Sequence, residues 1–265
     1  MITRKTAAFG LLAALFIQGG VLAQNAPPPK LADAKPGELR MSVTAAIRIP
    51  IDAVRDQASK AAGKPLFIEY GSARGGLKDE IVAGQDFDVA ILLPDVNDEL
   101  VAKGKADPRR YEIARVPVAI GLRGDVAGVD VSTPEALKAT MLKAKSVKYA
   151  PTGAALMTVR KILTTLNIAS TIKDSSTVRG QVPLGPGEYE INLYPLSEIL
   201  PNTALKNLGP VIPQLQVPAV IECVIGKNAR DKKAALALIR FLQGHAIDSA
   251  LAGNGMTKST VSHKG

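Results

Sequence analysis

Three short loops of small residues carry the groups in this sequence that could bind a ligand. Each loop follows an apolar segment of strand length and precedes a segment with helical spacing. Free backbone N–H groups at the start of a helix attract anions, and Gly lets the backbone approach a ligand closely. Small residues before helices are also ordinary turn chemistry, so only the three loops together predict an anion site. The candidate contacts are Thr44, Ala45 and Ala46 in the first loop, Ser72, Arg74 and Gly75 in the second, and Thr152, Gly153 and Ala154 in the third.

Two larger polar side chains could add to this site. If Arg74 points inward, its guanidinium can form a two-pronged hydrogen bond with a carboxylate or phosphate. If it points outward, it is a solvated cation of the loop. Tyr194 ends a predicted strand over residues 190–194 and is either a hydroxyl donor to the ligand or an aromatic residue of the core.

Residues that could support catalysis or hold a metal are sparse. A Ser nucleophile needs a base, and neither His245 nor His263 stands near a plausible nucleophile or has metal-ligating neighbours at ligand spacing. Asp88 opens a predicted strand and Glu198 a predicted helix. No Lys-Ser/Thr pair follows a Gly-rich loop, as it does in phosphate-binding loops of nucleotide hydrolases. We expect no catalytic residue, no metal and no cofactor.

The composition favours a basic protein with aliphatic cores. Hydrophobic residues make up 46% of the chain, aromatic residues only 4%, and Trp is absent, so Ala, Val, Ile and Leu must build the cores. The single Cys, Cys223, lies in an apolar run and is expected to be a buried structural thiol. The net charge of +9 attracts anions. The basic residues are scattered without interleaved aromatics, so we expect no nucleic-acid partner.

The first residues have the pattern of a secretory signal. Arg4 and Lys5 precede an apolar run from Ala7 to Ile17, and small residues end at Ala23. A membrane anchor would need roughly 20 apolar residues, more than this run provides. We expect residues 1–23 to be a cleaved signal peptide, residues 24–37 to be a flexible Pro- and Ala-rich leader, and the mature protein to lie in the periplasm without a lipid anchor.

Strands and helices alternate along the rest of the chain. Apolar strand-length segments are followed by segments with apolar residues at spacings of three and four, which indicates a parallel sheet covered by helices on both faces. Such folds bind ligands at the carboxyl ends of their strands. In the first half the predicted strands are 39–43, 65–70 and 88–93, and the predicted helices are 47–61, 77–83 and 96–103.

A second alternation begins after a long extended stretch from Tyr111 to Arg123. Ser132 and Glu135 form a predicted capping box at a helix start. Another extended run, Gln216 to Ile225, is interpreted as the return crossing. We therefore predict a two-lobed α/β fold, with two doubly wound sheets joined by two crossover strands and the ligand between the lobes. The predicted lobes are residues 38–118 with 219–265, and residues 119–218.

Five segments of the chain resemble the molybdate-binding branch of the type II periplasmic solute-binding proteins. The resemblance covers nearly the whole chain after residue 38, and residues 81–89 are its most specific part. The segments are 39–46, 69–72 followed by Leu77, 81–89, 193–200 and the helix 234–242.

The resemblance implies a metal-free site in which hydroxyl groups and backbone N–H groups hold a tetrahedral oxyanion. This sequence has Ala46 where the family usually has Ser, and Arg74 where it has a small or hydroxyl residue. The family's Tyr aligns with Tyr194 or Pro195. The expected ligand is a small anion, either a molybdate-like oxyanion or a carboxylate, and the expected partner is the permease of an ABC-type transporter. We expect a monomer.

Two other functions stay open at this point. The same fold could serve in sensing or in protein interaction, which would go with a flat apolar surface patch and no tightly bound small ligand. It could also be a small lyase or isomerase, which would require titratable side chains at the ligand site.

Overall fold

The computed structural model describes residues 34–178 and 180–258 of the chain. The predicted signal peptide, most of the predicted leader and His263 lie outside these residues. Among the described residues, no helix is both long and apolar enough to cross a membrane.

The described residues form two separate β-sheets. The first has the strand order β10-β4-β9-β3-β1-β2 and the second the order β6-β7-β5-β8. Together they give the mixed α/β architecture that the sequence predicts. The strands of the first sheet are β1 (Leu39–Thr44), β2 (Leu66–Gly71), β3 (Val89–Leu92), β4 (Tyr111–Val116), β9 (Ala219–Ile225) and β10 (Thr257–Lys258). Those of the second are β5 (Val118–Arg123), β6 (Ser146–Tyr149), β7 (Glu190–Pro195) and β8 (Lys206–Pro210).

The strands that connect the two sheets make both sheets mixed rather than wholly parallel. β1, β2 and β3 are parallel to one another, and so are β6 and β7. β9 is antiparallel to β3, and β5 is antiparallel to β7. A strand that arrives from the other sheet enters without a crossover helix, so it can run opposite to its neighbours.

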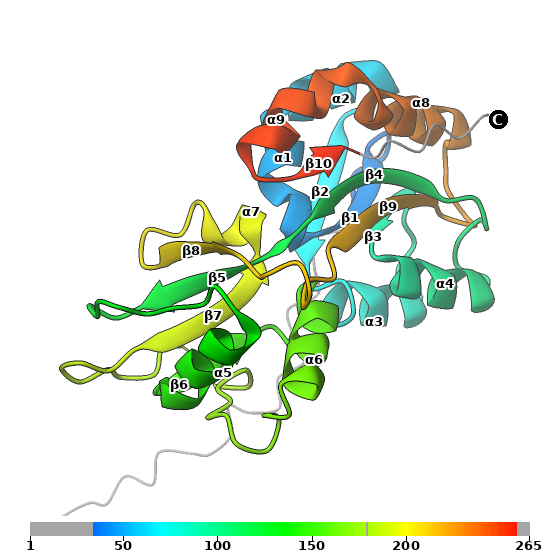
Figure 1. Cartoon of the computed structure of the whole chain (residues 1–265). Helices are drawn as coiled ribbons and strands as arrows, with labels where there is room; N and C mark the ends of the chain where they lie inside the picture. The colour runs from blue at the N-terminus through cyan, green and yellow to red at the C-terminus, as the bar shows by residue number, and fades with distance from the viewer. Residues whose placement is uncertain (1–33, 179, 259–265) are drawn as a thin grey trace, which may run out of the picture. The chain divides into compact units, whose positions relative to one another are not determined.

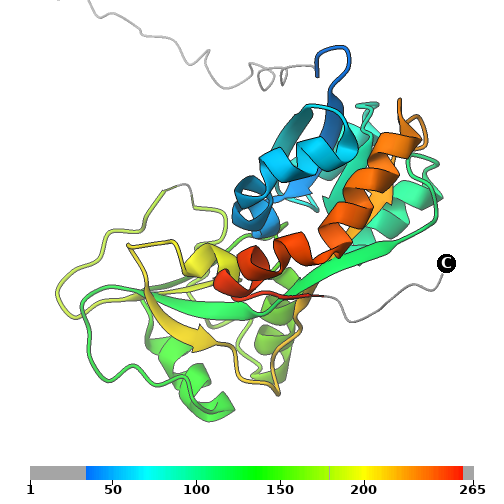
Figure 2. The same ribbon diagram turned by 90° about the horizontal axis from the view of Figure 1, so that it is seen from above.

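Helices cover both faces of the first sheet (Figures 1 and 2). α2 and α8 pack against each other on one face with α1 and α9, and α3 and α4 lie on the other face. The helices are α1 (Arg48–Ala53), α2 (Arg55–Ala62), α3 (Gly76–Val82), α4 (Pro94–Ala102), α8 (Lys232–Gln243) and α9 (Asp248–Gly253), with the 3-10 turns η1 (Ala45–Ile47) and η2 (His245–Ile247).

The second sheet carries α5 (Pro134–Lys143) and α6 (Leu156–Thr165) on one face and the short α7 (Leu196–Ile199) on the other (Figure 1). α7 lies close against β5 because residue 121 is Gly. A Cβ there would stand 2.9 Å from Ile199 Cδ1 and 2.8 Å from Leu205 Cδ1. The missing side chain therefore makes room for α7.

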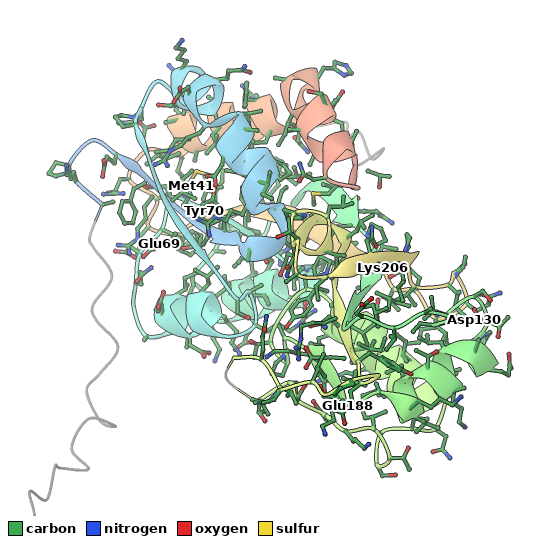
Figure 3. The ribbon with its side chains drawn as sticks, turned by 90° about the vertical axis from the view of Figure 1, so that its left-hand side faces the viewer. Met41, Glu69, Tyr70, Asp130, Glu188 and Lys206 are labelled. Atoms are coloured by element: carbon green, nitrogen blue, oxygen red, sulfur yellow. The ribbon has the colours of Figure 1, made fainter. Side chains whose placement is uncertain are left out.

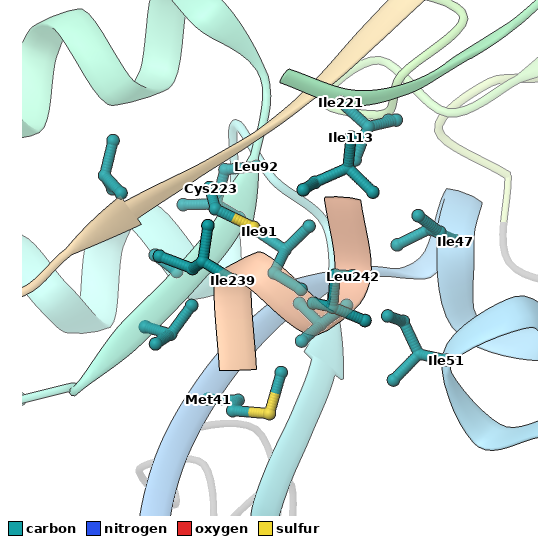
Figure 4. Close-up of a cluster of buried hydrophobic side chains, with 14 of the residues drawn as sticks. Met41, Ile47, Ile51, Ile91, Leu92, Ile113, Ile221, Cys223, Ile239 and Leu242 are labelled. Atoms are coloured by element: carbon teal, nitrogen blue, oxygen red, sulfur yellow. The ribbon is translucent and has the colours of Figure 1, made fainter. Parts of the chain in front are cut away.

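Each sheet has its own aliphatic core. Figure 4 shows the larger core, in which Met41, Ile91 and Cys223 of the sheet lie in one buried cluster with Ile51 of α1 and Leu242 of α8. The second core lies between its sheet and α5 and α6. Cys223 is fully buried, and burial raises the pKa of its thiol, in agreement with the predicted structural role.

The chain passes between the sheets twice. β4 ends at Val116 and β5 begins at Val118, so Pro117 alone separates a strand of one sheet from a strand of the other. The return runs through residues 211–218 into β9. The two crossings lie where the extended runs predict them, and the lobe boundaries drawn at them stay a prediction.

The buried charged side chains of the first sheet and its β3 approach, Arg40, Glu69 and Asp88, have partners. Arg40 of β1 donates to Glu69 Oε2 of β2 at 3.0 Å, and both side chains are buried; Figure 3 labels Glu69 on its strand. Asp88 accepts from the backbone N of Arg40 and of Arg230, each at 2.7 Å. Asp88 therefore fixes the approach to α8 and is not a free carboxylate.

Two local predictions need correction. The helix predicted over 47–61 is interrupted at Val54, which separates α1 from α2. The N-cap of α5 is Thr133 and not Ser132, because Thr133 Oγ1 accepts from the backbone N of Ala136 at 3.1 Å. Pro134 then occupies the first helical position, where its missing N–H costs nothing.

Candidate functional site

Loops 1 and 2, residues 44–46 and 71–76, leave the first sheet side by side. β1 and β2 are parallel neighbours, and their register pairs Thr44 with Gly71. The two loops therefore begin at the same edge of the sheet, at its carboxyl end, as the sequence predicts.

Loop 3, residues 150–155, leaves the second sheet beside the end of β7. β6 and β7 are parallel, and their register pairs Tyr149 with Leu193. Tyr194 and α7 follow Leu193 directly, so loop 3 and the segment 194–199 also share one edge.

Loops 2 and 3 contact each other across the two sheets. Ser72 Oγ lies 2.8 Å from Thr152 O and 2.7 Å from Thr152 Oγ1. The backbone N of Arg74 donates to Thr152 O at 3.1 Å. Gly75 allows this approach, because a Cβ there would lie 3.0 Å from Thr152 Oγ1.

Loop 1 contacts α7, which makes the second connection between the sheets. Ser197 Oγ donates to Ala46 O at 2.6 Å, and both residues are buried. Each of the four segments 44–47, 71–76, 150–155 and 194–199 is thus bonded to, or in register with, the next. We call this arrangement the four-segment ring.

Every predicted contact residue lies on the ring, with different exposure. Thr44, Ala46 and Ala154 are buried, Ala45 and Thr152 are exposed, and Ser72, Arg74, Gly75, Gly153 and Tyr194 are partly buried. The sequence thus identified segments that do meet. No bound molecule tests their contact with a ligand, so those individual roles stay predictions.

Arg74 has protein partners. Its Nε and Nη2 donate to the two carboxylate oxygens of Asp95 at 2.6 and 3.0 Å, and its Nη1 donates to Gly153 O at 2.7 Å. The guanidinium therefore joins loop 2 to loop 3 and is neutralised by Asp95. The sequence pattern could not indicate that Asp95 is a partner of Arg74.

Several backbone N–H groups of the loops are also engaged. The amide of Gly75 donates to Ser72 O at 3.3 Å, and that of Gly153 donates to Ala150 O at 3.0 Å. Together with the amide of Arg74, these donors serve the loops themselves. Loops 2 and 3 thus offer fewer free donors than their Gly content predicts.

The segment 194–199 contributes two polar side chains that have no hydrogen-bond partner among the described residues: Tyr194 and Glu198. Glu198 is partly buried, and burial raises the pKa of its carboxyl to about 7 from the ordinary 4.5. Burial and the nearby Glu198 and Glu190 charges raise the pKa of Tyr194, which keeps its phenol protonated. The sequence interpretation treated Glu198 only as a helix-start residue. Its position four residues after Tyr194, a predicted contact residue, could have marked it as a further candidate for the site.

Comparison with models of protein families identifies the family of this chain. Residues 39–257 match the family of bacterial extracellular solute-binding proteins. The chain belongs to this family. The match covers both sheets and every segment of the ring.

Solved structures of solute-binding proteins share the fold. The periplasmic molybdate-binding protein of Azotobacter vinelandii superimposes with a TM-score of 0.61 at 18% identity, covering 83% of this chain and 98% of that one. The sulfate-binding protein SubI from Mycobacterium tuberculosis gives a TM-score of 0.64 at 11% identity, over 84% and 87%. These likenesses confirm, at the level of fold, the predicted resemblance to type II binding proteins of the molybdate-binding branch.

One curated relative has an enzyme's name. An aconitate isomerase of Pseudomonas sp. is 22% identical over 206 residues, which is 74% of this chain and 79% of that protein. The proteins similar to this chain thus include one named as an enzyme as well as binding proteins.

A pocket of about 220 Å³ adjoins the ring of this solute-binding protein. Apolar side chains line most of it, among them Met157 and Pro218, and the Arg74–Asp95 pair forms one wall. It lies where loop 2, α6 and the return crossing meet. No group of three or more His, Cys, Asp or Glu residues within 34–178 and 180–258 is arranged to hold a metal ion.

Proposed function

We propose that this solute-binding protein captures a small anion within the four-segment ring. The observation that supports this most directly is the ring itself, which joins the carboxyl ends of β1, β2, β6 and β7 by contacts between the two sheets. Ligands of open α/β sheets bind at such ends. The basic net charge of +9 favours an anion.

Capture would use hinge motion at the two crossings. Pro117 and Pro218 lie at or beside the only chain segments that connect the sheets within residues 34–178 and 180–258, so rotation there would open the ring without disturbing either core. A ligand that contacts both sides stabilises the closed form by its differential affinity. The Ser72–Thr152 and Ser197–Ala46 contacts would then belong to the closed form.

The delivery partner we propose is the permease of an ABC-type uptake system, reached from the periplasm by a monomeric protein. Membership of an extracellular solute-binding family and the pattern of a secretory signal in residues 1–23 support this. Sensing through the same capture step is compatible with the ring, and it would need a protein partner instead of a permease.

A thermal-shift series tests the anion class. Molybdate, sulfate, phosphate, trans-aconitate and fumarate are each titrated into the protein at pH 6.0. A true ligand raises the melting temperature in proportion to the logarithm of its concentration once it exceeds Kd. A melting temperature that none of the five changes would contradict capture of a small anion.

A second candidate is an isomerase that moves a proton on a small carboxylate. Two observations favour it: the aconitate isomerase match and the carboxyl of Glu198 on the ring. A group with a pKa near the working pH can both take and return a proton. Incubating the protein with trans-aconitate and following the olefinic proton by NMR tests this. Formation of the cis isomer, lost in Glu198→Gln, would establish turnover, and an unchanged spectrum would leave binding alone.

A further inference from the structure

Glu198 differs from the buried carboxylates Asp88 and Glu190. Asp88 and Glu190 are buried and satisfied by protein donors, the latter by Arg123 Nε at 3.1 Å and Ser146 Oγ at 2.6 Å. Glu198 has neither a hydrogen-bond nor an ion-pair partner among the described residues. A carboxylate withdrawn from water without a partner is costly unless it is protonated or meets a ligand.

The position of Glu198 connects it to the ring. Its neighbour Ser197 is bonded to Ala46 of loop 1, and Tyr194, four residues earlier, is close enough for the Glu198 charge to raise its pKa. Tyr194 and Glu198 therefore stand together beside loop 1, each with an uncommitted polar group.

Among the described residues, no positive charge on the elements packed against α7 offsets Glu198. α7 packs against β5, β7, β8 and η1, and its Leu196 also stands against Gly255 after α9. On these elements the titratable groups are Arg123, Glu190, Tyr194 and Lys206, and η1 has none. Arg123 is paired with Glu190 at the end of the sheet away from α7, and Lys206 is exposed. Burial is the cause of the raised pKa, with no charged partner contributing.

Most polar groups of loops 2 and 3 are committed to protein partners. Ser72 is bonded to Thr152, the guanidinium of Arg74 to Asp95 and Gly153, and the amides of Gly75 and Gly153 to their own loops. A neutral carboxyl at Glu198 and the phenol of Tyr194 supply two uncommitted O–H donors.

Resting on the capture function proposed above, we propose that Glu198 and Tyr194 contact the bound solute, and that Glu198 does so as a neutral carboxylic acid. This arrangement couples capture to one proton, because the ionised form of Glu198 would repel an anionic ligand.

The coupling between ligand binding and protonation of Glu198 predicts how the apparent Kd changes with pH. If only the acid form binds, the apparent Kd is the intrinsic value divided by the fraction of protein in that form. With the carboxyl pKa at about 7, the Kd rises roughly 30-fold between pH 6.0 and pH 8.5. Ligand binding at pH 8.5 then takes up about one proton per protein.

Isothermal titration calorimetry with trans-aconitate and fumarate, in two buffers of different ionisation enthalpy, tests this. We expect the rise in Kd and the proton uptake in the wild type. Glu198→Gln keeps a donor and an acceptor, so it should bind at both pH values without the pH dependence, and Glu198→Ala should bind weakly at both. Glu99→Gln, which changes a partly exposed carboxylate of α4 that is paired with Lys78, is the control and should bind the ligands as the wild type does.

The outcomes separate the two proposals. A wild type that binds these carboxylates, with Glu198→Ala equally tight and equally pH-dependent, would overturn the role of Glu198 and leave capture intact. A ligand-free check is the ¹³C titration of the Glu carboxyls, and a Glu198 signal that titrates at its ordinary value would overturn the inference even if no probe binds.

Discussion

At the scale of single residues, environment decides which carboxylates are structural and which are available. Asp88 receives two backbone donors and the Arg230 side chain, so its carboxylate oxygens are committed to the protein. Glu198 is partly buried with no such donors. The sequence could indicate the chemistry of both residues but not this difference, because the donors that satisfy Asp88 come from positions 48 and 142 residues away.

Glu198 makes stability depend on pH. Its pKa is raised from 4.5 to about 7 in the fold, so the folded state prefers the protonated form. The stability associated with that form is fully present below about pH 4.5 and is lost as the pH rises through 7. Glu198→Gln, which cannot ionise, should unfold like the wild type at pH 4.5 and at a temperature a few degrees higher at pH 8.

Thermal unfolding of the ligand-free protein at the two pH values measures this effect. Glu99→Gln is again the control, with a difference from the wild type that stays the same at both. A gap between wild type and Glu198→Gln that does not widen with pH would show that Glu198 ionises normally in the fold.

At the scale of elements, the sequence predicts regular segments well and their ends less well. The strands β1, β2 and β3 and the helices α3, α4, α6 and α8 follow from hydrophobic spacing, because that spacing reports which face is buried. The edge strand β8 was not predicted, since its residues are largely exposed and carry no apolar pattern. The break at Val54 between α1 and α2 is likewise absent from the spacing.

The start of α5 offers a direct test of a cap. Thr133→Ala removes the side-chain acceptor for the Ala136 amide and should lower the free energy of unfolding by about 1 kcal/mol. Ser132→Ala, one residue earlier, is the matched control and should change it by less than about 0.5 kcal/mol. Chemical denaturation of both variants provides the comparison. A larger cost at Ser132 would restore the capping box that the sequence suggested.

At the scale of the whole molecule, the ring is a product of tertiary structure. The three small-residue loops could be predicted because each follows a strand and precedes a helix. Their mutual contacts could not, because Ser72 and Thr152 are 80 residues apart and Ala46 and Ser197 are 151 apart. The same holds for Arg74. Neither of the two orientations that the sequence left open for its side chain took account of Asp95, which pairs with it.

The contact between loops 2 and 3 should affect capture more than folding. Ser72→Ala removes the hydroxyl that joins loop 2 to Thr152 and should weaken ligand binding about 2- to 13-fold, since one hydrogen bond is worth about 0.5–1.5 kcal/mol. Ser59→Ala removes a comparable hydroxyl bond to Lys64 O within the first sheet's helices. We expect Ser59→Ala to lower the free energy of unfolding by a similar amount and to leave the affinity for the ligand unchanged. Equal affinity losses in the two variants would argue against a closing contact.

The central claim is that a small anion binds within the four-segment ring. Amide NMR of the ¹⁵N-labelled protein, titrated with the ligand that gives the largest thermal shift, tests it most directly. We predict that the largest shift changes fall on residues 44–47, 71–76, 150–155 and 194–199, with smaller changes at the crossings near Pro117 and Pro218. Saturable changes confined to another part of the molecule, with these four segments unaffected, would contradict the account.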